Sequence, residues 1–77
     1  MIKSLTEMAP GESGVIVKIG GGRGIVRRLD ALGLRPGKRV LKAGAQFFRG
    51  PVVVTVDGRQ IALGFGMAGR VMMEVGE

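Results

Sequence analysis

The chain changes from helix to strand within residues 25–37, which read IVRRLDALGLRPG. Ile25, Leu29 and Leu32 recur at i, i+4 and i+7, the spacing that places apolar side chains on one face of a helix. Gly33 follows where a helix end favours positive φ, and the leucine after it can supply the apolar contact that accompanies such an end. We therefore predict a short helix that ends at Gly33 and that must pack on a sheet to be stable.

Two Pro-Gly pairs, at residues 10–11 and 36–37, predict type II turns. Proline presets φ at the second position of such a turn, and glycine supplies positive φ at the third. A strand candidate follows each pair: Gly14–Ile19, which is rich in β-branched residues, and Lys38 to about Gln46. The predicted helix therefore lies between the first two predicted strands.

The C-terminal half predicts three more strands. Val52–Val56 is the clearest of them, and the Asp57-Gly58 pair after it is a strong hairpin signal. Gln60–Leu63 is the returning strand, and residues 64–69 form a tight connection that one helical turn would fill. The last strand alternates, with Val71, Met73 and Val75 on one face and Met72 and Glu74 on the other.

About five short strands at a spacing of roughly 8–12 residues predict a mainly β fold, a small barrel or sandwich. The chain has 77 residues, so we expect a single domain over residues 1–77. Closure of the sheet would also remove most of its exposed edge. The longest uncharged stretch near the C-terminus, Gln60–Gly69, is glycine-rich and too short to span a membrane.

The amino-acid composition argues against catalysis and metal binding. The chain contains no Cys and no His, so it lacks the usual metal ligands and the usual general base near neutral pH. No carboxylate pair has a suitable partner, and methionines more often fill gaps in a core than bind metal. We therefore expect no enzyme activity, no catalytic residue, no cofactor and no metal site.

Two glycine-rich stretches invite a ligand-binding interpretation. Residues 64–69 match G-x-G-x-x-G, but a strand follows them where a dinucleotide site needs a helix, so we interpret them as turn glycines. Gly20–Gly24 could form an anion-binding nest with Arg23 as counter-charge. It lacks the P-loop pattern, and a plain loop is the better interpretation.

The positive charge is concentrated in one segment. The net charge is +6, and nine basic residues stand against the single acid Asp30 between Lys18 and Arg49. Such a segment attracts acidic proteins, anionic lipid or nucleic acid, although it can also serve only as a solubilising surface. Nucleic acid is the serious alternative, with Phe47, Phe48 and Phe65 as the available stacking side chains. The absence of Tyr and Trp makes it the less favoured one.

Several motifs, taken in order, resemble the ferrous iron transport protein A (FeoA) family over about residues 5–75. The most specific motif is Leu-Gly-Leu-x-Pro-Gly at residues 32–37, which follows an Arg-Leu pair. The other motifs are Met-x-Pro-Gly-Glu at residues 8–12, Gly50-Pro51 before the valine-rich strand, Ile-Ala-Leu-Gly at 61–64 and Ala-x-x-Val-x-Met at 68–73. The resemblance implies a small SH3-like barrel. It also implies a cytoplasmic accessory protein that acts by contact with FeoB, a GTPase-linked ferrous iron permease.

Charge and resemblance together predict a partner-binding surface of Arg27, Arg28, Leu34 and Arg35. Arginine can form bidentate hydrogen bonds with carboxylates, and it is enriched at interface hot spots. We expect this surface to dock an acidic patch on the cytoplasmic part of the transporter or to lie near the anionic inner leaflet. The alternative is that Leu34 plugs the barrel and the arginines only solvate it. Lys42 departs from the apolar residue typical of the family, which leaves the inward register of its strand open.

Overall fold

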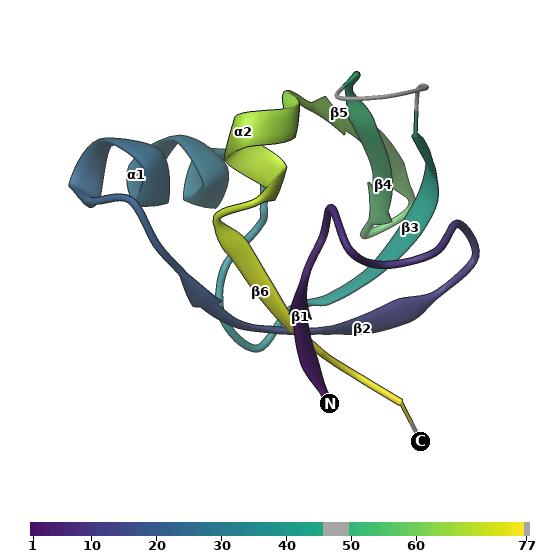
Figure 1. Cartoon of the computed structure of the whole chain (residues 1–77). Helices are drawn as coiled ribbons and strands as arrows, with labels where there is room; N and C mark the ends of the chain where they lie inside the picture. Colours follow the sequence, from purple (N-terminus) through teal and green to yellow (C-terminus); the bar gives the residue numbers. More distant parts are fainter. Residues whose placement is uncertain (46–49, 77) are drawn as a thin grey trace.

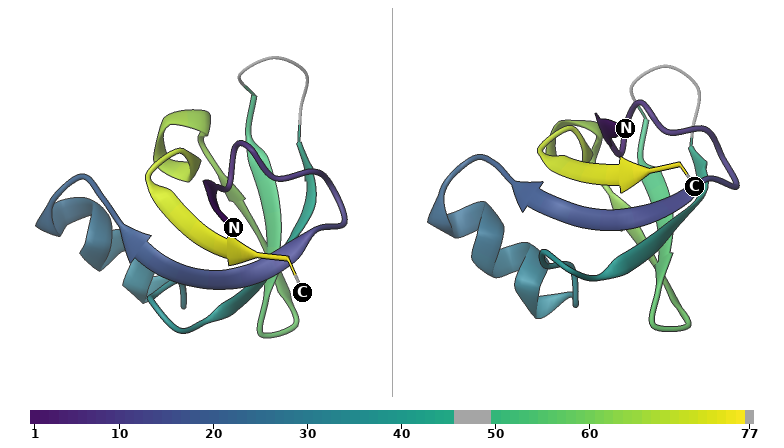
Figure 2. Two further views of the ribbon diagram at one scale, coloured as in Figure 1. Left: turned by 60° about the horizontal axis from the view of Figure 1, so that its bottom comes forward. Right: turned by 90° about the horizontal axis from the view of Figure 1, so that it is seen from below.

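The computed structural model of the chain describes residues 1–45 and 50–76. An antiparallel six-stranded sheet of order β1-β6-β2-β3-β4-β5 dominates it, and two short helices complete it. The elements, in chain order, are β1 (Ile2–Ser4), β2 (Ser13–Ile19), α1 (Arg23–Ala31), β3 (Arg39–Ala45), β4 (Val52–Val56), β5 (Arg59–Leu63), α2 (Phe65–Ala68) and β6 (Val71–Val75). Figures 1 and 2 show the sheet curling, so that its inner face surrounds the core.

The mainly β prediction is confirmed, but the predicted barrel of about five strands is an open sheet of six, with β1 and β5 at its edges. Because β1 precedes the others, α1 lies between the second and third strands rather than between the first two. The missed strand has only three residues and no apolar alternation. It exists because Lys3 pairs with Met73 from the far end of the chain, which no local pattern indicates.

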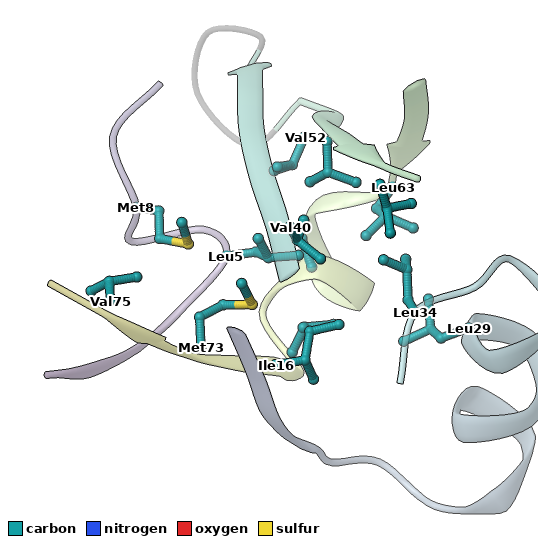
Figure 3. Packing of buried hydrophobic residues seen from close by; sticks show 14 residues of the cluster. Leu5, Met8, Ile16, Leu29, Leu34, Val40, Val52, Leu63, Met73 and Val75 are labelled. Atoms are coloured by element: carbon teal, nitrogen blue, oxygen red, sulfur yellow. The ribbon is translucent and has the colours of Figure 1, made fainter. Parts of the chain in front are cut away.

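The core is a cluster of apolar side chains that are at most 3% exposed, and Figure 3 shows how they converge. Strands β2 to β6, both helices and the segment after β1 contribute to it. Its members are Leu5, Met8, Ile16, Leu29, Leu34, Val40, Val52, Val54, Val56, Leu63, Ala68, Val71, Met73 and Val75. Each fully buried aliphatic side chain contributes about 1.5–3 kcal/mol relative to an exposed one, so nearly every element is held through this cluster.

The turns form as predicted. Glu12 N–H donates to the Ala9 carbonyl and Lys38 N–H to the Arg35 carbonyl, each across a Pro-Gly pair, and both glycines have positive φ. Asp57 and Gly58 both have positive φ, as the type I′ turn between β4 and β5 requires. The Pro-Gly turns therefore come just before β2 and β3, and the Asp57-Gly58 turn joins the paired strands β4 and β5.

Lys42 points inward, which answers the question that its strand left open. Its side chain is only 3% exposed, and Nζ donates to the main-chain carbonyls of Met8 at 2.5 Å and Thr6 at 3.4 Å. Burial lowers the pKa of Lys42, an effect that nearby Glu12 opposes. The lysine thus ties the segment between β1 and β2 to β3, a role that an apolar side chain at this position could not perform.

Candidate protein-interaction surface

The first turns of α1 present cations to solvent. Ile25 and Leu29 pack against the core, and the helix period turns Arg23, Arg27 and Arg28 away from it. All three arginines are exposed, and in the described part of the chain none has an acidic side chain within 4 Å. The predicted partner-binding surface included Arg27 and Arg28 but not Arg23, which was considered only with the glycine-rich stretch around it. The helical spacing of four between Arg23 and Arg27 was a usable signal.

Leu34, the apolar member of the predicted surface, is fully buried and therefore takes no part in an exposed contact. Its N–H donates to the Leu29 carbonyl, and Gly33 N–H donates to the Asp30 carbonyl. Together with φ of 89° at Gly33, these two bonds form a Schellman motif. Figure 3 shows Leu34 beside Leu29, the apolar contact that accompanies this motif.

Arg35 is exposed but already engaged. Its Nε lies 2.7 Å from an Asp30 carboxylate oxygen, and its terminal nitrogen reaches the Asp30 carbonyl at 3.3 Å. The hydrogen bond to Asp30 is the main cause of the raised pKa of Arg35. Of the predicted residues, the structure therefore brings Arg27 and Arg28 together as free cations and assigns Leu34 and Arg35 to the end of the helix.

The β4–β5 hairpin contacts the C-terminal end of α1 and the turn that follows it. Arg59, at the start of β5, donates to the Leu32 carbonyl at 2.9 Å. Lys38, which precedes β3, pairs with Asp57 in the β4–β5 turn at 3.0 Å. Arg59 therefore attaches the hairpin to the end of α1, and Lys38 ties the same hairpin to the start of β3.

The described residues form no pocket in which a small ligand could be enclosed, so the α1 surface is suited to contact with another macromolecule. Residues 1–45 and 50–76 contain no enclosed pocket and no group of three potential metal-ligating side chains. In the same residues, no helix is long and apolar enough to cross a membrane. Of the aromatic residues considered for nucleic acid, Phe65 is 38% exposed on α2, while Phe47 and Phe48 lie outside the described residues.

Residues 3–75 match the family model described as the FeoA domain. The chain belongs to the FeoA domain family. A curated relative, a Methanocaldococcus jannaschii protein named as a candidate Fe(2+) transport protein A, is 34% identical over 67 residues, which cover 87% of this chain and 79% of the relative. This match extends over most of both chains.

Solved structures share the fold. The crystal structure of an iron uptake regulatory protein (FeoA) superposes with a TM-score of 0.89 at 37% identity and covers 97% of each chain. A manganese-dependent transcriptional repressor gives 0.88 at 19% identity, over 96% of this chain but 41% of the repressor. At that identity the likeness shows the fold alone. The SH3-like fold that the resemblance implied is consistent with these structures.

Proposed function

We propose that this FeoA-family chain is a cytoplasmic accessory protein of ferrous iron uptake that acts by contact with an FeoB-type GTPase-linked permease. The names of its relatives support the link to iron transport. The observation that carries the mode of action is the set of exposed arginines on α1, which have no acidic partner among the residues that the structure describes. The helix is anchored at its other end. The complete absence of Cys suits a reducing compartment.

Whether a cation already has a carboxylate partner within the chain decides whether it can bind a carboxylate of another protein. Arg35 and Lys38 already have carboxylate partners, so a second acidic group would gain little by displacing these. Arg27 and Arg28 have no such partner in the described residues, and a carboxylate of the permease could form new bidentate bonds with them. The docking surface proposed here is therefore Arg23, Arg27 and Arg28 of α1, with Val26 next to Arg23.

Val26 gives this surface an apolar edge. Its side chain is 38% exposed, and the i, i+3 spacing places it next to Arg23. Interfaces commonly combine apolar contact with charged groups, and arginine is among the residues that contribute most. The surface has no pocket and no aromatic anchor, which favours a broad, charge-directed contact.

The test is co-purification of the tagged chain with the permease, followed by calorimetric titration against the cytoplasmic part of the permease. The charge reversal Arg27→Glu/Arg28→Glu should weaken binding at least about 30-fold, since two charge-assisted contacts of about 1 kcal/mol each or more are lost. Lys18→Glu/Arg39→Glu is the matched control, because it changes the net charge equally on another surface.

Three results would count against the proposal. Failure of the wild-type chain to bind the permease would remove the proposed partner. Equal loss of affinity in both double variants would mean that binding depends on net charge and not on the α1 surface. Unchanged affinity in Arg27→Glu/Arg28→Glu, with an unchanged unfolding midpoint, would exclude α1 as the docking surface.

A further inference from the structure

A second exposed surface lies on the outer side of the sheet, away from the core. Ile2 pairs with Glu74, Glu74 with Val15, and Val15 with Arg39. Residues directly opposite one another on antiparallel strands share a face, so these four side chains form one row across β1, β6, β2 and β3. Leu41 belongs to the same face because it follows Arg39 by two positions.

Exposed aliphatic side chains lie among charged ones on this face. Ile2 is 55% exposed and Leu41 is 38% exposed, and Val17 at the irregularity in β2 is 42% exposed. Lys18 and Arg39 are exposed, and in the described part of the chain neither has a carboxylate within 4 Å. Four of the six large apolar side chains that are most exposed, Met1 included, thus belong to β1 to β3 or precede β1 directly.

Arg70 extends the positive charge to one end of the face. Its carbonyl accepts a hydrogen bond from Gly20 N–H, and a Cβ on Gly21 would lie 2.8 Å from its Cδ. The Arg70 side chain therefore lies against the glycines that follow β2. These glycines come two and three residues after Lys18 in the sequence. The one acid in the row, Glu74, is paired with the terminal amino group at 2.7 Å, so it leaves little negative charge unbalanced.

No helix or strand of residues 1–45 and 50–76 covers this face. In the right view of Figure 2, β2 runs across the front of the molecule and neither helix passes over it. Both helices instead bury side chains in the core, Leu29 from α1 and Ala68 from α2. The outer face is therefore available to a partner in the folded chain.

We propose that this outer sheet face, formed by Ile2, Val15, Lys18, Arg39, Leu41 and Arg70, rests on an anionic lipid bilayer. Unpaired lysine and arginine side chains attract phosphate headgroups, and exposed aliphatic groups among them can enter the layer just beneath. The face has no aromatic residue, and valine and leucine are under-represented at protein hot spots, so a lipid surface fits it better than a protein partner. This contact uses residues separate from the α1 surface and is testable without the permease.

The experiment is co-sedimentation of the full chain with vesicles of phosphatidylcholine, with and without phosphatidylglycerol. We expect binding only to the anionic vesicles, falling as salt is raised because the headgroup potential is screened. Each basic residue near an anionic surface contributes about fivefold, so Lys18→Gln/Arg39→Gln should weaken partitioning about 30-fold. Leu41→Ser should weaken it further without changing the charge.

The matched control is Arg27→Gln/Arg28→Gln, which removes the same charge from α1 and should retain most of the vesicle binding. Equal loss in the two double variants, or equal binding to neutral vesicles, would overturn the assignment of this face. So would a Leu41-dependent dimer in sedimentation that binds no vesicle, since the face would then join two copies. Because the permease is absent from this assay, its failure leaves the proposed transporter contact standing.

Discussion

The two ends of α1 use charge in opposite ways. At the C-terminal end, Asp30 and the Leu32 carbonyl are engaged by Arg35 and Arg59. At the N-terminal end, Gly22 provides no side-chain cap and the first turn contains no acid. A cation there, Arg23, opposes the helix dipole instead of balancing it. One end therefore stabilises the fold, whereas the other leaves its cations and N–H groups available for contacts with other molecules.

The largest expected difference between the ends concerns apolar burial. Leu34→Ala should lower the free energy of unfolding by about 2–5 kcal/mol, because it leaves a cavity beneath the Schellman motif. Val26→Ala, on the exposed side of the same helix, should change it by about 0.5 kcal/mol or less. Urea denaturation monitored by circular dichroism measures both, and equal effects would mean that the helix end is not anchored as described.

Two glycines that follow α1, each at a turn position with similar positive φ, sharpen the comparison. Gly33 has φ of 89° and Gly37 has φ of 95°, so alanine at either position costs about 1–2 kcal/mol. At Gly33 the added Cβ would also lie 2.9 Å from an Arg59 guanidinium nitrogen, whereas at Gly37 it meets nothing within 4 Å. Gly33→Ala should therefore be the more destabilising in the same urea assay, and the reverse order would contradict the packing of Arg59 over the helix end.

The smallest expected effects come from single cations at the two ends. Arg59→Met keeps the aliphatic stem but loses the bond to the Leu32 carbonyl, so unfolding should become easier by about 0.5–1 kcal/mol. Arg23→Met removes a charge that opposes the helix dipole, so stability should stay the same or rise by about 0.3 kcal/mol. Thermal unfolding of the two variants side by side tests the sign, and a loss of stability in Arg23→Met would show that this arginine is structural.

Features with a local cause could be predicted from the sequence. The helix end at Gly33, both Pro-Gly turns and the Asp57-Gly58 hairpin each depend on residues a few positions apart, and each formed as expected. Strand Val52–Val56 matched its predicted bounds because its β-branched residues form one unbroken run. Of the candidate site, Arg27 and Arg28 were predictable as exposed cations because the helix period alone turns them away from Ile25 and Leu29.

Features with a distant cause could not be predicted in this way. Leu34 and Arg35 were included in the predicted surface, yet one fills the core and the other pairs with Asp30. Arg70 reaches the corner at Gly21 only because β6 pairs with β2. The pairing of β1 and the burial of Lys42 likewise depend on strands or carbonyls remote in the chain.

The amino-acid sequence by itself determined the positions of the turns, the end of the helix, the excess of positive charge and the lack of the side chains that most often perform catalysis. The turns and the helix end follow from backbone preferences that act over a few residues. The charge and the missing side-chain types follow from composition, which does not depend on the fold. Only the tertiary structure decided which cations are neutralised by folding and which remain free. Ion pairs such as Lys38–Asp57 need two groups within a few ångströms, and that distance is set by strand pairing rather than by sequence separation.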